Sequence, residues 1–263
     1  MPVSQTNFLI HSTAIVSPGA ELASDVQVGP YCVIAEDVIV EQGTRLLSHV
    51  CLEPGARIGK NCQIHQGAVI GGRPQDLKFA GEKTYAYIGD NTVIREYVTV
   101  SRGTKQRGET RIGENCFLMA YAHIAHDCIL GNSVILANAV NLAGHVEIDD
   151  FAIIGGVVPV HQFVRIGCHS IIGGGFRVQM DVCPYMLAAG YPLKIYGLNR
   201  VGLERRGFSE KTLANLEKAY RILFRSKLNT QAALLKLRNE TEFTPETEKI
   251  VSFIEKSERG IVK

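Results

Sequence analysis

The chain has 263 residues, of which 46% are hydrophobic and 21% charged, as in a globular protein rather than a disordered one. Its net charge of only +2 gives no overall preference for nucleic acid. No apolar run approaches the roughly 18–20 residues that span a bilayer, and residues 1–12 lack the regions of a signal peptide. The seven cysteines are therefore expected to be reduced thiols of a cytoplasmic protein.

An aliphatic residue recurs at every sixth position from Ile10 to Val178. Only three of these 29 positions are not Ile, Leu or Val. A period of six fits a short strand followed by a corner, with the aliphatic side chain pointing into a narrow prism. The residue four positions later is small or β-branched and is expected to fill a second interior slot. Four cysteines occupy such slots and are interpreted as structural: Cys32, Cys62, Cys116 and Cys128.

The three exceptions predict two loops that leave the wall of the prism. Asp76 and Glu82 lie within about residues 71–87, and Gln106 lies within about residues 101–111. Each puts a polar side chain where the prism needs an aliphatic one. Loops on a rigid scaffold often carry binding and catalytic residues, so function is expected near them.

The period fades after Val178, and a helical pattern starts at about residue 191. This predicts a β-helical domain over residues 1–190 and an α-helical domain over residues 191–263. Ser209 and Thr244 are suited to cap two of its helices. Residues 194–227 contain nine Lys or Arg and three Glu, a charge of +6, which is either a solvated helical face or a dock for an acidic partner.

The repeat resembles that of the hexapeptide-repeat acyltransferases. The resemblance implies a mainly β fold, a left-handed parallel β-helix in which three hexapeptides form one coil, followed here by a small α-helical domain. With coils about 4.8 Å apart, counting three hexapeptides onward from His126 reaches Gly144 and then Gln162. His145 and His161 lie next to them in the sequence. These residues are therefore expected to form a ladder along one edge of the prism.

Two kinds of chemistry fit the stretch HIAHDC, residues 123–128. His126 with Asp127 has the groups of a general base and its orienting carboxylate, and the Gly144 backbone N–H one coil further on is placed to stabilise an oxyanion. Alternatively, His123 and His126 are two ligands of a metal site that other coils or another subunit complete.

Five motifs occur in order along nearly the whole chain: QDLK, HIAHDC, LAGHVEIDDFAIIGG, VHQF and GLERRGF. With them the chain resembles the bacterial UDP-N-acetylglucosamine O-acyltransferases. The resemblance implies transfer of an (R)-3-hydroxyacyl group from acyl carrier protein to the 3-hydroxyl of UDP-N-acetylglucosamine, in the lipid A biosynthesis of lipopolysaccharide. It implies a homotrimer with neither metal nor cofactor, since the donor is carried on the phosphopantetheine of acyl carrier protein.

The resemblance also implies residue roles. His126 would be the base, Asp127 its partner and Gly144 the oxyanion donor. Gly174 would set the acyl-chain length and leave room for a long chain, although a tight corner would also favour glycine there. The residues implied to hold the sugar nucleotide or line the cleft are Gln75, Asp76, Lys78, His123, His145, His161, Gln162, Asn199, Arg205 and Arg206.

Two other functions stay open. A zinc-dependent β-helix enzyme, such as a trimeric carbonic anhydrase, would use the histidines as ligands and lose activity to a chelator. A non-catalytic β-helix that binds sugar nucleotides would leave His126 and Asp127 without a role.

Overall fold

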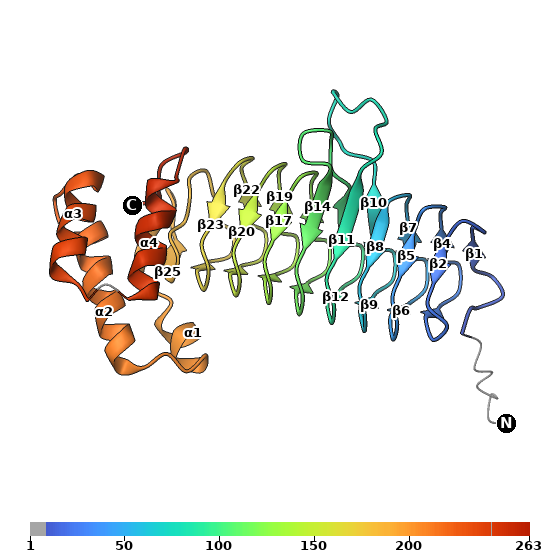
Figure 1. Cartoon of the computed structure of the whole chain (residues 1–263), viewed down its shortest axis with the longest axis horizontal. Coiled ribbons are helices and arrows are strands. Elements are labelled where there is room, and N and C mark those ends of the chain that lie inside the picture. Colours follow the sequence, from blue (N-terminus) through green and yellow to red (C-terminus); the bar gives the residue numbers. More distant parts are fainter. Residues whose placement is uncertain (1–8, 243) are drawn as a thin grey trace.

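The computed structural model describes residues 9–242 and 244–263. It is an elongated prism of stacked coils with a group of helices at its C-terminal end (Figure 1). Three sheets form the walls, and up to β24 each takes every third strand in chain order, after which β25 and β26 extend the third sheet. The predicted fold class, a mainly β parallel helix followed by helices, is confirmed.

Wall 1 contains β1 (Ile15–Val16), β4 (Val33–Ile34), β7 (Cys51–Leu52), β10 (Val69–Gly72), β13 (Thr99–Ser101), β16 (His123–Ile124), β19 (Asn141–Leu142) and β22 (Pro159–Val160). Wall 2 contains β2 (Glu21–Leu22), β5 (Ile39–Val40), β8 (Ala56–Ile58), β11 (Tyr85–Ile88), β14 (Glu109–Ile112), β17 (Ile129–Leu130), β20 (Glu147–Ile148) and β23 (Arg165–Ile166). Wall 3 contains β3 (Gln27–Val28), β6 (Arg45–Leu46), β9 (Gln63–Ile64), β12 (Val93–Ile94), β15 (Phe117–Leu118), β18 (Ile135–Leu136), β21 (Ile153–Ile154), β24 (Ile171–Ile172), β25 (Met186–Ala189) and β26 (Lys194–Leu198).

The six-residue period produces these walls directly. The aliphatic residue and the small residue four positions later both point into the prism: Ile124 and Cys128, for example, are fully buried. Each buried Ile or Leu contributes roughly 1.5–3 kcal/mol. The residue directly before the small one turns the corner with its backbone in the left-handed region, as Asp127 does with φ 61°. The four cysteines interpreted as structural are buried, and all seven are free thiols.

Both predicted loops leave the prism at one edge, where wall 1 passes to wall 2. They comprise residues 73–84, between β10 and β11, and residues 102–108, between β13 and β14, and both project from the prism in Figure 1. They are slightly shorter than predicted because β10, β11, β13 and β14 extend further than the other strands. We call them loop 1 and loop 2.

The loops change the spacing between coils by whole hexapeptides. A regular coil pairs residues 18 apart, such as His123 with Asn141. Across loop 1 the pairing is Val69 with Thr99, 30 apart, and across loop 2 it is Thr99 with His123, 24 apart. The insertions are therefore twelve and six residues long, which is why the aliphatic period resumes in the same phase after each of them.

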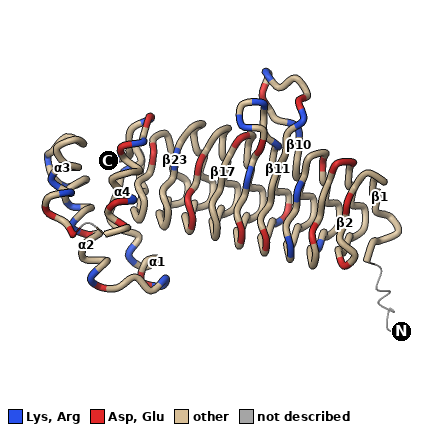
Figure 2. Tube along the Cα trace, viewed as in Figure 1, with Lys and Arg blue, Asp and Glu red and all other residues tan. Residues whose placement is uncertain are grey.

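The C-terminal region contains α1 (Arg200–Arg205), α2 (Glu210–Tyr220), the π-helical turn η1 (Arg221–Arg225), α3 (Thr230–Glu240) and α4 (Pro245–Glu255). The predicted caps are confirmed: the side chains of Ser209 and Thr244 accept hydrogen bonds from the first turns of α2 and α4. Basic residues recur along α1, α2 and α3 (Figure 2). No helix in the described part of the chain is both long and apolar enough to cross a membrane.

The prediction of helical structure from about residue 191 is wrong for residues 194–198. These residues form β26, which pairs antiparallel with β25 and closes the end of wall 3. The antiparallel partner is supplied by the preceding strand of the wall, a contact that the local helical pattern does not reveal. The division into two domains at residue 190 stays a prediction.

Candidate active site

His126 and Asp127 form a hydrogen-bonded pair at the corner between β16 and β17. This corner lies on the same edge as the two loops, one coil beyond loop 2. Nδ1 of His126 lies 2.8 Å from Oδ2 of Asp127, whose side chain is fully buried. Because an ionised carboxylate only accepts hydrogen bonds, Nδ1 carries the proton. The second ring nitrogen, Nε2, is thereby left as the basic atom, as general-base catalysis requires.

The Asp127 carboxylate also accepts two hydrogen bonds from Thr104 in loop 2. The Thr104 backbone N–H donates to Oδ1 at 2.9 Å, and its hydroxyl donates to Oδ2 at 2.7 Å. Burial by itself raises the pKa of Asp127, but the hydrogen bonds from His126 and Thr104 outweigh it and hold the pKa below its usual value. Asp127 is thus an anion at neutral pH.

Gly144 lies directly against the ring of His126. A Cβ atom at this position would be 2.7 Å from Cε1 and 2.9 Å from Nε2 of the imidazole, so any side chain would displace the ring. The Gly144 N–H has no hydrogen-bond acceptor among residues 9–242 and 244–263. A free N–H beside the basic nitrogen is the arrangement that an oxyanion requires. The ladder counted from the sequence therefore brings His126 and Gly144 together.

Two further predicted histidines adjoin this pair. His145 stacks on Phe163 of the next coil, with ring centroids 4.5 Å apart, and its Nε2 lies 3.6 Å from Oδ2 of Asp127. His123, on β16, makes a 2.7 Å hydrogen bond between its Nδ1 and the hydroxyl of Thr99. Burial lowers the pKa of both rings; the Asp127 anion opposes this effect at His145, and protonated His126 adds to it at His123. Both are accordingly neutral donors or acceptors at neutral pH.

Loop 1 carries the predicted sugar-nucleotide residues. Gln75 and Lys78 are exposed, and Asp76 accepts a hydrogen bond from the Lys78 backbone N–H at 3.0 Å. The Asp76 carboxylate is close enough to His145 to raise the pKa of that ring slightly. The structure therefore places Asp76 in the neighbourhood of the histidines.

Loop 1 is held by Phe79 and Glu82. Phe79 is only 5% exposed, and the guanidinium groups of Arg73 and Arg102 lie 5.5 and 5.4 Å from its ring centroid. Glu82 accepts hydrogen bonds from the N–H groups of Ala80 in loop 1 and Lys105 in loop 2. The two loops are thereby tied to each other above the corner of the base.

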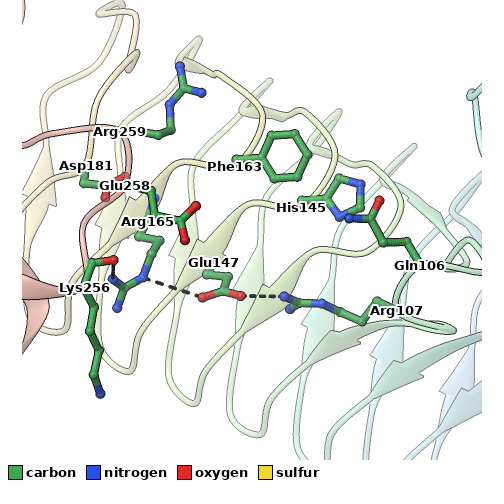
Figure 3. Close-up of a pocket in the computed structure, with 10 residues that line it drawn as sticks. All are labelled: Gln106, Arg107, His145, Glu147, Phe163, Arg165, Asp181, Lys256, Glu258 and Arg259. Carbon is green, nitrogen blue, oxygen red and sulfur yellow. Dashed lines mark hydrogen bonds and ion pairs between the residues drawn. The ribbon is translucent and has the colours of Figure 1, made fainter.

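A hollow of about 560 Å³ opens beside His145 and Phe163 (Figure 3). Loop 2, the corner residues His145 and Phe163, wall 2 and the segment after α4 line it. Glu147 on its floor is paired with Arg107 at 2.6 Å and with Arg165 at 3.7 Å. Of the residues predicted for the site, only His145 lines this hollow, so it flanks the His126–Asp127 pair without containing it.

Three predicted residues lie further along the prism. His161 and Gln162 line a second hollow of about 270 Å³, which lies toward wall 1. Gly174 is exposed on another edge, where wall 3 passes to wall 1, and a Cβ there would approach the carbonyl oxygen of Gly156 to 3.1 Å. The left-handed residue of this corner is Gly175, with φ 78°, and not Gly174. Backbone conformation therefore does not account for glycine at position 174.

Asn199, Arg205 and Arg206 lie at a different edge, where wall 2 passes to wall 3. Asn199 is 5% exposed; it caps α1 through Gly202 N–H and donates to the carbonyl oxygen of His169. Arg206 lies over the ring of Phe151 at 5.1 Å, and burial lowers its pKa. Within one chain the structure does not bring these three residues to His126.

His126, Asp127 and His145 are also the residues that suit a metal ion. Their donor atoms lie within 4.8 Å of one another, and no other such cluster occurs among the described residues. Oδ2 of Asp127, however, already accepts hydrogen bonds from His126 and Thr104. A metal ion would have to displace these hydrogen bonds, and its coordination would compete with the pairing of His126 Nδ1 with the carboxylate.

Two residues of the site were not predicted from the sequence. Phe163 lies 18 residues after His145, so the same counting that related His126 to Gly144 would have identified it. Thr104 lies in the insertion of loop 2, and no spacing in the sequence relates it to Asp127.

Comparison with known proteins finds the same similarity over nearly the whole chain. The family profile described as "Udp N-acetylglucosamine O-acyltransferase; Domain 2" matches residues 181–262, and "Bacterial transferase hexapeptide (six repeats)" matches residues 109–144. The proteins named acyl-[acyl-carrier-protein]–UDP-N-acetylglucosamine O-acyltransferase from Thiobacillus denitrificans and Alkalilimnicola ehrlichii are 51% and 52% identical over 255 residues, covering 97% of this chain and 99% of each relative. The solved UDP-N-acetylglucosamine acyltransferase from Bacteroides fragilis is 43% identical with a TM-score of 0.95, over 97% of this chain and 100% of that one.

Proposed function

Since this chain belongs to the UDP-N-acetylglucosamine O-acyltransferase family, we propose that it uses the His126–Asp127 pair as the base of that reaction. It is an acyl-carrier-protein-dependent enzyme of lipid A biosynthesis, and UDP-N-acetylglucosamine is its acceptor. The (R)-3-hydroxyacyl group leaves the thioester of acyl carrier protein and forms an ester with the 3-hydroxyl of the sugar.

The observation that carries the assignment of the base is the hydrogen bond between His126 Nδ1 and the buried carboxylate of Asp127. It leaves Nε2 free to accept the proton of the sugar hydroxyl as that oxygen attacks the thioester carbon. The Asp127 anion then stabilises the imidazolium. His126 returns the proton to the departing phosphopantetheine sulfur, which regenerates the neutral imidazole.

Gly144 supports the same step from the next coil. As the thioester carbonyl becomes tetrahedral, its oxygen gains negative charge, and the free N–H of Gly144 is available to donate to it. The absence of a side chain at this position also lets the substrate reach Nε2, because a Cβ would come within 2.9 Å of that atom. Gly144 thus contributes both a donor and the space for the reacting carbonyl.

The remaining substrate-binding roles require a second subunit. Asn199, Arg205 and Arg206 lie at another edge of the prism from His126, so one chain alone cannot place them on the same sugar nucleotide. A homotrimer in which each site takes loop 1 and the histidines from one chain and α1 from its neighbour resolves this separation. The planar, five-donor guanidinium of Arg205 or Arg206 suits a phosphate of the nucleotide.

We further propose that catalysis needs no cofactor beyond the phosphopantetheine that carries the acyl group, and that the protein acts in the cytoplasm. The carboxylate of the His–Asp pair is occupied by protein donors, which favours a base over a metal ligand. The seven free thiols suit a reducing compartment.

The test is acyl transfer from a series of (R)-3-hydroxyacyl carrier proteins to UDP-N-acetylglucosamine, with a metal chelator present. We expect product from the unaltered protein, and at least about a hundredfold less from His126→Ala. Loss of activity to the chelator, restored by zinc, would instead support a metal-dependent enzyme. A protein that binds the sugar nucleotide without forming product from any donor would be a non-catalytic binding protein.

A further inference from the structure

Thr104 connects loop 2 to the proposed catalytic pair through hydrogen bonds to Asp127. Regular coils have no such loop. We infer that Thr104 is a positioning residue, which holds the Asp127 carboxylate in the orientation that fixes the ring and the tautomer of His126. This inference rests on the proposed function, in which His126 is the base.

The geometry of the contact is bidentate. The backbone N–H and the hydroxyl of Thr104 donate to the two different oxygens of Asp127, at 2.9 and 2.7 Å. Two parallel hydrogen bonds from one residue fix both the position and the plane of the carboxylate. Thr104 is 6% exposed and Asp127 0%, so water does not readily replace these bonds.

Thr104 is itself held on both sides. Its carbonyl oxygen accepts a hydrogen bond from Gly108 N–H at 2.7 Å, which closes loop 2. The N–H of Lys105, the next residue, donates to Glu82 of loop 1 at 3.2 Å. A Cβ at Gly103 would lie 2.3 Å from the backbone nitrogen of Glu109, so the chain before Thr104 has room only for glycine. The loop therefore presents Thr104 to Asp127 as a rigid donor.

Thr104 does not touch the reacting atoms; it acts through Asp127. Its hydroxyl draws negative charge of the carboxylate toward itself and away from His126. Without that hydroxyl, more of the charge faces His126, which then holds its proton more tightly. The neutral, active form of the base is reached only at higher pH, and the less restrained carboxylate orients the ring less well.

Three variants separate positioning from a general loss of structure. Thr104→Val removes the hydroxyl and keeps the shape, whereas Thr104→Ser keeps the hydroxyl. Thr44→Val is the matched control, because Thr44 is also buried and makes two hydrogen bonds, to Gly59 O at 2.8 Å and from Cys62 N at 3.0 Å, in the wall of a remote coil.

We expect Thr104→Val to lower kcat about 10- to 100-fold and to move the acid limb of the kcat/KM profile to higher pH. Thr104→Ser should restore most of the loss, and Thr44→Val should leave the profile where it is. An unshifted profile in Thr104→Val, or a serine variant as impaired as the valine variant, overturns the inference.

A second measurement does not depend on acyl transfer. NMR titration of histidine-labelled protein should show a higher His126 pKa in Thr104→Val than in the unaltered protein, and an unchanged one in Thr44→Val. An unaltered protein that forms no product refutes the proposed function. The titration still decides whether Thr104 acts on His126.

Discussion

The close approach of Gly144 to His126 makes Gly144→Ala a sharp test of the active-site geometry. The new Cβ would lie 2.7 Å from Cε1 of the imidazole, whereas ordinary contacts of this kind are 3.4–4 Å, so the ring has to retreat by about 0.7 Å or more. Because a misplacement of about 1 Å costs on the order of 100-fold in rate, we expect kcat to fall about 10- to 100-fold.

Stability should change little in this variant. The backbone of Gly144 is not in the left-handed region, and alanine at such a position stabilises a protein by about 0.4–1 kcal/mol through the unfolded chain. The His126 side chain is 14% exposed, so its ring can turn outward without disturbing the core. The expected result is a folded protein with the kcat lowered about 10- to 100-fold.

The assay is acyl transfer at saturating donor and acceptor, beside a thermal unfolding scan. Gly197→Ala serves as the control. A Cβ at Gly197 would have no atom within 4 Å, and the backbone conformation of Gly197 is one that alanine adopts. A folded Gly144→Ala protein with the kcat of the unaltered enzyme would refute this reasoning, since His126 would then not need its observed position.

Two further predictions concern pH and chain length. Burial lowers the pKa of His169 from 6.5 to about 4. Between these two pH values the unfolded chain binds a proton that the folded protein does not. The free energy of unfolding therefore falls as the pH falls through this window. His169→Phe keeps the ring between Phe151 and Tyr185 and should reduce the loss between pH 7 and 4.5 by about 1–2 kcal/mol in urea unfolding; an equally steep loss would contradict the assignment. Gly174→Met should shift the preference among hydroxyacyl donors toward shorter chains by at least about tenfold in relative kcat/KM, because its side chain would cover this exposed corner once the Gly156 carbonyl oxygen, 3.1 Å from the new Cβ, has moved slightly; an unchanged preference would place the end of the acyl chain elsewhere.

Much of the prism can be predicted from the sequence because its contacts repeat. Each residue of a regular coil packs on the residue 18 positions away, so once the family resemblance supplies three hexapeptides per coil, counting along the sequence relates His126 to Gly144. The same period exposes the loops, since a polar residue such as Asp76 cannot occupy an interior slot. The caps Ser209 and Thr244 are equally readable, because capping involves residues only three apart.

Contacts without a period required the tertiary structure. The strand at residues 194–198 forms because β25 offers it an open edge with which to pair. A helical pattern of side chains does not indicate such a partner. The side chain of Asn199 binds α1 and the backbone at His169, which separates it from the base within one chain.

The repeating sequence by itself therefore determined the interior positions of the walls, the two loops and the adjacency of His126 and Asp127, and with the coil length of the family it also gave the edge on which the histidines lie. Only the tertiary structure decided how that pair is held. Thr104 reaches Asp127 from 23 residues earlier, through a loop that follows no repeat. The path of such a loop is set by its own turn and by Glu82 of the neighbouring loop, interactions that local sequence does not encode.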